Sequence, residues 1–574
     1  MIAALLLVLS CTSRGQGPRP SACEEGWSQW GLGPAHAGTS CAAVQPLTRI
    51  LADLVVDPFV LDERAEAGDD LLGHYQAPLL AGDDVFLEAK SGDYVPCNPP
   101  GGGQPAPCGP AAWDRQLWME RKYRWNGGAL ELRWRIASDW KPPPNAGHLN
   151  GWEPVFHAAL GPTDLWVPAA GGAVLQVDRE TGALRSRVDP FGGDPSSFVA
   201  GPITVDAAGN ALWTVIRFTS ATSPWTSEAH GALVRAGPAG GLSVVSFDGL
   251  VPGAPGAGDG CETSYAYDRR RPPPLPLLDG QGGILPAPQV PCGNQRPQLN
   301  AAPAVGRDGT IFLVSRAHRG ERASYLVALD GALAVKWAAS FRQPDVQDGC
   351  GVTVPTDGQG GNCLPGVPAG IDPDTGAPPA QRATDQSTAS PVALPDGSVL
   401  IGTYAAYNGS RGHLFRLDRN GQLAAVYDFG WDTTPAFFEH DGTWSIVLKD
   451  NHYDRNGPYL LTQLSADLAP EWSYANTNHL ACVRGPDGSV ACADNGEHPQ
   501  GFEWCVNAIV VDRNGVVLAN SEDGNLYAIE PGGQERQHLF LGSALGAAYT
   551  PLALDAKGRV YTQNAGHLYV IGGD

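Results

Sequence analysis

Short runs of alternating apolar and polar residues, each broken by an Asp/Gly or Asn/Gly turn, recur along the whole chain. One phrase joins a small residue and a proline to an apolar run, a turn and a second apolar run, as in GPITVDAAGNALWTV from Gly201. Alternation with a period of two, interrupted by such turns, predicts antiparallel β-hairpins. Eight copies of the phrase are present, with anchors at Pro78, Pro154, Pro202, Pro303, Pro391, Pro435, Ala508 and Pro551.

A second phrase follows most copies of the first and completes a unit of four strands. It is a glycine-led strand that ends in Asp and a turn, as in GHLFRLDRNG from Gly412, and a further apolar run closes several units, as in LAPEWSYA from Leu468. Four strands in roughly 40 to 45 residues is the pattern of a propeller blade. The sequence predicts an all-β, eight-bladed β-propeller of four-stranded antiparallel blades. Seven blades are possible because the first unit is irregular, and a β-sandwich or solenoid is the competing fold.

The last repeat leaves one blade a strand short. The unit that begins at Thr550 stops at Asp574 after its third strand. An unpaired sheet edge is a liability that ring closure removes. We therefore expect an N-terminal strand, within LTRILADLVV from Leu47, to supply the missing partner and close the ring.

Two of the repeats resemble a known family of propellers. The phrases QVDRETGALRSRV from Gln176 and VALDGALAVKW from Val327 look like the pyrroloquinoline-quinone (PQQ)-like repeat, and WSQWGLGPAHAG from Trp27 resembles the opening of PQQ-like propeller lipoproteins of bacteria. The family includes the propeller subunit of the outer-membrane barrel-assembly machinery and quinoprotein dehydrogenases. The resemblance spans residues 27–574 and implies the fold more than a function, because propellers host many unrelated activities.

Composition and charge narrow the partners. The 574 residues include 73 Gly and 50 Pro, which favours many short strands over helices. The net charge of −22 repels phosphate backbones and anionic lipid heads. Nucleic acid is therefore excluded as an expected partner, and membrane contact is expected only through an N-terminal anchor.

The N-terminus predicts export. Residues 2–9 (IAALLLVL) form an apolar run too short to span a bilayer, and Ser10 and Cys11 follow it. We interpret residues 1–11 as a signal peptide whose Cys11 resembles the lipidated cysteine of a lipobox, residues 12–26 as a polar tether, and residues 27–574 as one propeller domain. An ordinary cleaved signal is the alternative. Either reading places the protein in the periplasm, in the outer membrane or at the surface of a bacterium.

The cysteines mark long insertions between the repeats. The expected insertions are 87–112, 254–300, 342–388 and 476–504, and local disulfides would stabilise them. Metal binding is the competing interpretation, but the sequence contains no CxxC pair. Cys505 is left over, and the neighbouring candidates for disulfides are Cys23 with Cys41, Cys97 with Cys108, Cys261 with Cys292, Cys350 with Cys363, and Cys482 with Cys492.

The direction of the strands predicts which face carries these insertions. Turns between first and second and between third and fourth strands lie on one face, here the turn face. Connections between second and third strands and between blades lie on the other, here the insertion face. All four insertions belong to the insertion face, and binding residues concentrate on loops held by a rigid scaffold. We expect the insertion face, with the mouth of the central channel, to be the working surface.

The residues just before the innermost strands are candidates for a ring around the channel mouth. Aromatic and amide side chains there could bind a small polar ligand such as a glycan, or could only cap the channel. The candidates are Trp152, Glu153, Asn300, Ser390, Asp432, Thr434, Trp504, Asn507 and Tyr549.

No catalytic motif is apparent. The sequence lacks G-x-S-x-G and HExxH, and the polar stretch 450–454 (DNHYD) lacks the full calcium-loop pattern, which favours a hairpin loop. The leading hypothesis is an exported, lipid-anchored module that binds an envelope protein or ligand. The alternative is a quinoprotein dehydrogenase with PQQ and calcium, although the sequence has neither an adjacent Cys-Cys pair nor a CxxCH haem motif. A propeller glycosidase or lyase has no supporting motif.

Overall fold

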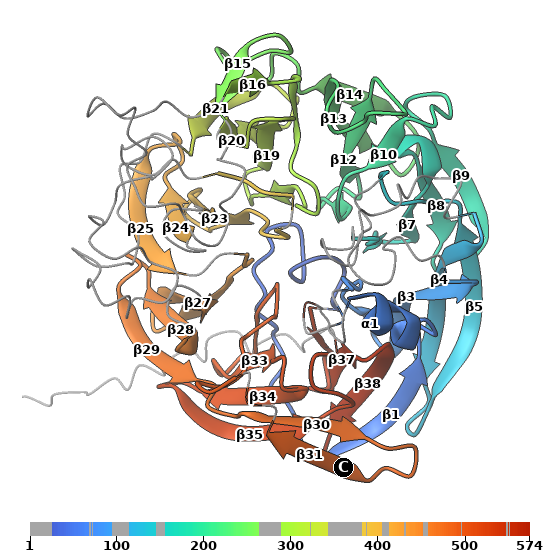
Figure 1. Ribbon diagram of the computed structural model, residues 1–574, viewed down its shortest axis with the longest axis vertical. Helices are drawn as coiled ribbons and strands as arrows, with labels where there is room; N and C mark the ends of the chain where they lie inside the picture. The colour runs from blue at the N-terminus through green and yellow to red at the C-terminus, as the bar shows by residue number, and fades with distance from the viewer. Residues whose placement is uncertain are drawn as a thin grey trace, which may run out of the picture.

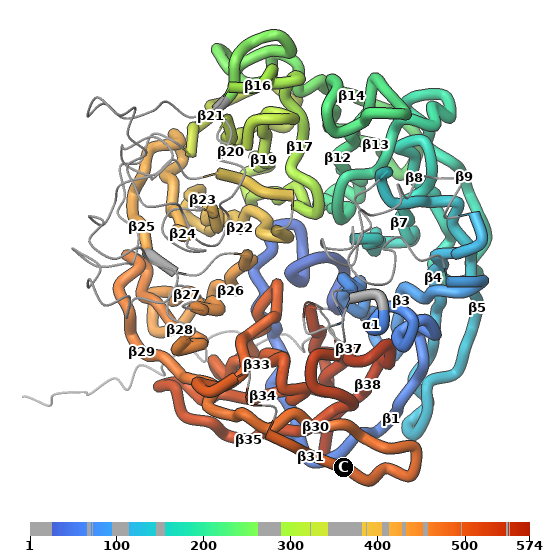
Figure 2. Tube along the Cα trace, in the orientation of Figure 1, coloured from blue at the N-terminus to red at the C-terminus, as the bar shows by residue number. Residues whose placement is uncertain are grey.

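Eight four-stranded antiparallel blades form a closed ring in the computed structural model (Figures 1 and 2). The structure describes residues 26–67, 71, 73–94, 114–144, 155–262, 289–321, 323–341, 382–385, 387–404, 412–429, 432–451, 457–494, 496, 498–546, 549 and 551–573. The expected all-β, eight-bladed propeller is confirmed, and the count of seven blades is set aside.

The first four blades follow the chain, each from its innermost to its outermost strand. In blades 3 and 4 the innermost strand is interrupted, so that two short strands pair with the same neighbour. Blade 1 contains β2 (Leu79–Ala81), β3 (Asp84–Gly92), β4 (Gln116–Trp125) and β5 (Leu130–Ser138), and blade 2 contains β6 (Ala159–Leu160), β7 (Asp164–Pro168), β8 (Val174–Asp178) and β9 (Leu184–Val188), with a 3-10 turn at Ala170–Gly172. Blade 3 contains β10 (Ser197–Val199), β11 (Thr204–Val205), β12 (Ala211–Phe218), β13 (Ala229–Ala236) and β14 (Leu242–Ser246). Blade 4 contains β17 (Gln295–Pro297), β18 (Ala304–Val305), β19 (Ile311–Ala317), β20 (Ser324–Leu329) and β21 (Val335–Ser340).

Blades 5 to 7 repeat this order, and the last blade takes its fourth strand from the N-terminal part of the chain. Blade 5 contains β22 (Val392–Ala393), β23 (Val399–Gly402), β24 (Gly412–Leu417) and β25 (Leu423–Phe429); blade 6 contains β26 (Ala436–His440), β27 (Thr443–Asn451), β28 (Tyr459–Ser465) and β29 (Pro470–Ala475); blade 7 contains β32 (Val510–Val511), β33 (Val517–Asn520), β34 (Asn525–Glu530) and β35 (Gln534–Phe540); blade 8 contains β36 (Ala553–Leu554), β37 (Val560–Asn564), β38 (His567–Gly572) and β1 (Arg49–Val55).

The ring closes as the sequence predicts. Strand β1 pairs antiparallel with β38, in a register that runs from Arg49 opposite Gly572 to Val55 opposite His567. The predicted turns also form, because the Asp418 and Asp512 side chains accept the backbone amides two and four residues ahead. Closure by the N-terminal strand is confirmed.

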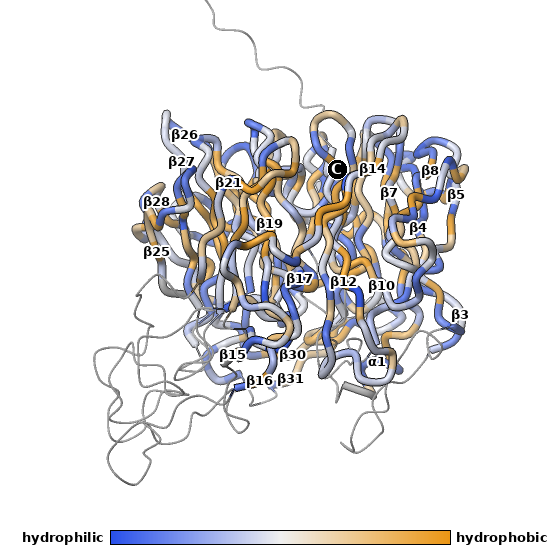
Figure 3. The backbone as a smooth tube through the Cα atoms, turned by 90° about the horizontal axis from the view of Figure 1, so that it is seen from above, coloured by the Kyte–Doolittle hydropathy of each residue, from blue (hydrophilic) through white to orange (hydrophobic). Residues whose placement is uncertain are grey.

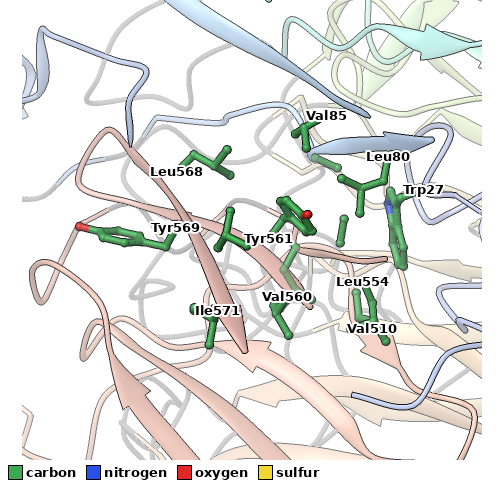
Figure 4. Close-up of a cluster of buried hydrophobic side chains, with 14 of the residues drawn as sticks. Trp27, Leu80, Val85, Val510, Leu554, Val560, Tyr561, Leu568, Tyr569 and Ile571 are labelled. Carbon is green, nitrogen blue, oxygen red and sulfur yellow. The ribbon is translucent and has the colours of Figure 1, made fainter. Parts of the chain in front are cut away.

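Apolar side chains fill the spaces between neighbouring blades. Figure 4 shows the cluster around blade 8, where Leu554, Val560 and Ile571 pack with Val510 of blade 7 and with Leu80 and Val85 of blade 1. Trp27, from outside the blades, belongs to the same cluster and is fully buried. Each blade therefore buries both of its faces against its neighbours, and every residue of inner strands such as β7 and β19 is buried.

The described insertions lie on one face, as predicted. Figure 3 shows the hairpin β15 (Gly260–Glu262) with β16 (Gln289–Pro291), the hairpin β30 (Leu480–Arg484) with β31 (Val490–Asp494), and helix α1 (Val60–Ala67) on the same side of the ring. The first insertion is shorter than predicted, because β3 continues to Gly92 in pairing with β4. Residues 95–113, 263–288 and 342–381 lie outside the described part.

Two of the five predicted disulfides are observed and a third is partly tested. Cys261 is bonded to Cys292 and Cys482 to Cys492. Cys41 is also disulfide-bonded. Among the described residues, no helix is both long and apolar enough to cross a membrane. The other predicted cysteines, Cys11, Cys23, Cys97, Cys108, Cys350 and Cys363, lie outside the described residues.

Candidate functional site

The segment that precedes β1 occupies the centre of the ring. It hydrogen-bonds in chain order to the innermost strands of blades 1 to 7 and to the first turn of blade 8, and Figures 1 and 2 show it in the middle of the propeller. These bonds lie beside the Asp/Gly turns, so the segment occupies the turn-face end of the channel. They join Leu80 to Trp27, Leu160 to Ser28, Val205 to the Gln29 side chain, Val305 to Pro34, Ala393 to Ala35, Phe437 to Ala37, Val511 to Gly38, and Gln45 to Gly558.

Close approach to the blades explains a glycine in this segment. Gly38 has a φ of 67°, and a Cβ atom there would lie 2.6 Å from the Ile509 carbonyl oxygen and 2.8 Å from the Ala436 Cβ. A larger residue would therefore push the segment away from blades 6 and 7. The WSQWGLGPAHAG phrase that marked the start of the propeller is thus the part of the chain that occupies the channel.

Two buried histidines form neutral hydrogen-bonded ties, His157 between blades 1 and 2 and His36 between the central segment and blade 5. His157 Nδ1 donates to the Ala158 carbonyl oxygen at 2.7 Å while its Nε2 accepts the Ala77 amide at 3.2 Å. His36 Nδ1 donates to the Pro391 carbonyl oxygen at 2.8 Å. Burial lowers the pKa of both imidazoles to about 4, since it penalises the charged form more than the backbone hydrogen bonds favour it. These side chains are neutral structural ties above about pH 5.

The described candidates for the channel-mouth ring are buried. Three of them form a chain of hydrogen bonds across blades 4 to 7: Ser390 Oγ accepts the Ala302 amide, Thr434 Oγ1 accepts the Ser390 amide, and the Thr434 amide donates to the Asn507 carbonyl oxygen, at 2.8 to 3.1 Å. Trp30 Nε1 of the central segment also donates to Thr434 Oγ1 at 3.2 Å. The structure thus gives these residues a role in spacing the blades.

Asn300, Trp504 and Tyr549 lie outside this chain of hydrogen bonds. Asn300 Oδ1 accepts the Val155 amide at 2.9 Å, and Trp504 packs edge-on against Tyr527 with a ring distance of 5.1 Å. Trp152 and Glu153 lie outside the described residues. Ligand binding by this ring stays a prediction.

A buried ion pair lies beside this chain. Asp432 Oδ1 accepts the Ser387 hydroxyl at 3.0 Å and the Thr388 amide at 2.7 Å. Its Oδ2 lies 3.5 Å from Lys449 Nζ, and both side chains are nearly inaccessible to water. Lys449 Nζ is also 3.5 Å from Asn507 Oδ1. Removing either charge would leave the other buried without its partner. The Asp432 hydrogen bonds to Ser387 and Thr388 join the start of blade 6 to the start of blade 5.

The thiol that the disulfide pairs left over lies in an acidic cluster. Cys505 Sγ donates to Glu522 Oε1 at 2.8 Å, and the ligand atoms of Glu503, Cys505 and Glu522 all lie within 4.8 Å of one another. Burial, followed by the negative charges of Glu522 and Glu503, raises the pKa of the Cys505 thiol well above its usual value. The protonated thiol is a poor nucleophile. The sequence offered one clue to this cluster, namely the unpaired cysteine next to the acidic Glu503.

These donors do not fit a calcium ion with a quinone cofactor. Calcium prefers a shell made wholly of oxygen atoms. Here Asp432 faces the Lys449 ammonium, and Glu522 accepts the Cys505 thiol. Trp504 is fully buried and its Nε1 donates to the Tyr459 carbonyl oxygen at 3.1 Å, so its face is not available to stack on a flat cofactor.

A cationic cluster joins blade 4 to the connection that follows it. Arg296 donates to both oxygens of Asp385, at 2.7 and 2.5 Å, and Arg316 Nη1 lies 3.1 Å from Asp385 Oδ2. Burial acts to raise the pKa of Asp385, but the two guanidinium groups hold it below its ordinary value. Both arginines are buried, so the carboxylate compensates charge that would otherwise be costly to bury.

A hollow on the outer side of the ring lies far from these groups. It has a volume of about 440 Å³ and lies between β8 and β9 of blade 2 and the β13–β14 turn of blade 3. Gln176 Nε2, on its wall, donates to Asp164 Oδ2 at 3.0 Å and to the Pro238 carbonyl oxygen at 2.9 Å. Its side-chain amide is therefore already engaged within the protein.

Comparison with known proteins supports the fold. No protein-family model matches the chain, and no curated protein matches it. Among solved structures, the quinohemoprotein alcohol dehydrogenase from Comamonas testosteroni is 12% identical with a TM-score of 0.51, over 96% of this chain and 81% of that one. This likeness, at such low identity, shows the shared propeller fold alone. The expected resemblance to PQQ-like propellers is confirmed at the level of fold.

Two further structures are similar to this chain with lower scores. A europium-containing methanol dehydrogenase is 11% identical with a TM-score of 0.48, over 94% of this chain and 90% of that one. BamB from Moraxella catarrhalis is 11% identical with a TM-score of 0.42, over 92% of this chain and 99% of that one.

Proposed function

We propose that this protein is an exported, lipid-anchored propeller whose insertion face binds a protein or a polar ligand of the cell envelope. One observation carries the proposal: the described insertions all lie on the insertion face, while the N-terminal segment occupies the opposite end of the channel. A ligand therefore meets disulfide-stapled loops on one side and short turns on the other. Rigid scaffolds that present loops in this way are typical of binding proteins.

The disulfides support export. Cys261 with Cys292 and Cys482 with Cys492 staple two small hairpins that have little core of their own. Such bonds persist in oxidising compartments and are rare in the cytosol of most organisms. The apolar run of residues 2–9 supplies the matching export signal, and Cys11, two residues after it, supplies the site for the lipid.

The chemistry of the channel end supports binding over turnover. The Cys505 thiol is held protonated by burial and by its acidic neighbours, and the Lys449 ammonium is paired with Asp432. Groups so engaged with one another are poorly placed to act on a substrate.

Co-purification from envelope extracts tests the binding role. We would compare the wild-type protein with a variant in which a Gly/Ser linker replaces residues 263–288, and with a turn-face control, Ala207→Arg, at an exposed turn position of blade 3. The wild type and the control should retain one specific envelope component that the loop variant loses. Turnover of a defined substrate by the purified protein, or loss of the component in the turn-face control, would contradict the proposal.

The anchor has a separate test. Cys11→Ser should abolish incorporation of radiolabelled palmitate and release the protein from the membrane fraction, because the thiol carries the lipid. An unchanged membrane fraction would remove the anchor from the proposal and leave the binding role in place.

A further inference from the structure

Seven of the eight outermost strands are protected against pairing with another chain. Each carries a β-bulge against its neighbour, and the inserted residue is charged in five of them. Bulges and charges are the means by which natural sheets block edge-to-edge pairing. The inserted residues are Leu51 in β1, Arg133 in β5, Arg185 in β9, Lys336 in β21, Ala424 in β25, Glu471 in β29 and Arg536 in β35.

The edge of β31 has none of this protection. It pairs with β30 in unbroken register from Val490 to Asp494, and all five of its residues are exposed. Its sequence is VACAD, in which the charge lies at the end of the strand. Among the described residues, no strand pairs with its outer side. An exposed, apolar edge without a bulge is a template for another strand.

The rest of the hairpin is held firmly. The Arg484 amide donates to the Gly542 carbonyl oxygen at 2.8 Å, and the Ala544 amide donates to the Cys482 carbonyl oxygen at 2.8 Å. Strand β30 thus lies between residues 542–544 and β31, and the Cys482–Cys492 disulfide links the two strands. The free edge is therefore presented by a fixed element on the insertion face (Figure 3).

The register shows which backbone groups face outward. Cys482 and Cys492 are directly opposite each other with their Cα atoms 4.0 Å apart, which is the short spacing of a non-hydrogen-bonded antiparallel pair. The N–H and C=O groups of Cys492 therefore point away from β30, and so do those of Val490 and Asp494, two residues to either side. These three residues offer the outward backbone hydrogen bonds that an added strand would use.

The side chains define what that strand must carry. Val490, Ala491 and Ala493 offer small apolar contacts, and the exposed Asp494 carboxylate lies at one end. We propose that β31 accepts an extended strand of a partner protein, paired antiparallel, with β-branched apolar residues along its length and a basic residue opposite Asp494. This inference rests on the proposed binding role and names the surface and the chemistry of the partner. Backbone pairing supplies affinity and the charge supplies orientation.

The experiment uses a defined peptide and the full-length protein. The probe is acetyl-Lys-Val-Thr-Val-Thr-amide with a fluorescent label, and its control carries the same side chains with the internal backbone nitrogens methylated. Ala493→Lys places a charge on the free edge, as natural edges do. Val244→Lys is the matched control, because β14 also lacks a bulge and Val244 is 44% exposed. Thermal unfolding confirms that both variants fold.

We expect the plain peptide to bind at least about tenfold more tightly than the methylated one, because methylation removes the donors that pair with an edge. Ala493→Lys should weaken binding at least about fivefold and Val244→Lys should leave it unchanged. Hydrogen exchange of segment 489–494 should slow when the peptide binds. Equal binding of both peptides, no binding at millimolar peptide, or equal loss in both variants would overturn the proposal.

Two further outcomes separate the possible occupants. A concentration-dependent dimer that Ala493→Lys abolishes would assign the edge to a second copy of this chain and overturn the partner strand. If Ala493→Lys still co-purifies the envelope component that the wild type retains, this inference fails and the binding role stands. If the wild type itself retains nothing, the proposed function fails first.

Discussion

Thr434 is the residue at which a structural role and a ligand-binding role predict different results. Its Oγ1 is fully buried and accepts both the Trp30 indole N–H and the Ser390 amide. Thr434→Val keeps the shape of the side chain but leaves two buried donors unpaired. An unpaired buried donor costs about 1 to 3 kcal/mol, so the variant should lose about 2 to 6 kcal/mol of unfolding free energy.

Denaturant unfolding followed by tryptophan fluorescence measures this loss. Trp30→Phe removes one of the two donors, so Thr434→Val should cost about 1 to 3 kcal/mol less in that background than in the wild type. Thr443→Val, at an exposed position at the start of β27, is the matched control and should change stability by less than about 0.5 kcal/mol. If Thr434→Val is as stable as this control, the residue does not space the blades, and the ligand-binding interpretation of the ring gains support.

Three other predictions follow from the buried groups. Burial holds the pKa of His36 and His157 near 4, below the unfolded value of about 6.5. Their contribution to the unfolding free energy is therefore complete above about pH 6.5 and falls by up to about 3 kcal/mol each as the pH drops towards 4. His157→Gln should flatten the measured dependence of unfolding free energy on pH, and an unchanged slope would contradict the assignment. The Cys505 thiol should react with iodoacetamide at pH 8 at least about a hundredfold more slowly in the folded than in the unfolded protein, and rapid native alkylation followed by mass spectrometry would contradict its burial. Replacing Cys482 and Cys492 by alanine should lower the stability of their hairpin by about 2 to 3 kcal/mol and speed its hydrogen exchange. The protection of β34 against exchange should not change. Loss of protection in both the hairpin and β34 would show that the hairpin supports the ring.

The features that the sequence predicted well are those with a local signature. The blade repeat is written in turns and alternation within about 45 residues, so the eight blades and the closing strand β1 could be read directly. The two observed disulfides join cysteines 31 and 10 residues apart. Close spacing leaves few other partners for each thiol, which is why neighbouring cysteines were a sound guide.

The features that the sequence hid depend on contacts between distant residues. Trp30 and Thr434 are 404 positions apart, and the segment around Trp30 has neither strand nor helix periodicity to announce its place in the channel. Of the candidates for the mouth ring, Ser390, Asp432, Thr434, Trp504, Asn507 and Tyr549 precede the innermost strands of their blades, and Asn300 lies between the two halves of the innermost strand of blade 4. Their burial could not be read, because it depends on neighbours that only the closed ring brings together.

The N-terminal part of the chain closes the ring in two ways, and this bears on where function can reside. Residues 27–45 hydrogen-bond to the innermost strands of blades 1 to 7 and to the first turn of blade 8, and β1 completes the eighth blade. Blades fixed at both their inner and their closing strands cannot slide past one another without breaking many hydrogen bonds at once. Recognition by movement of the blades is therefore disfavoured, and the parts of the chain free to vary with a partner are the insertions. An edge strand on a stapled hairpin, such as β31, can then bind a partner while the ring beneath it stays unchanged.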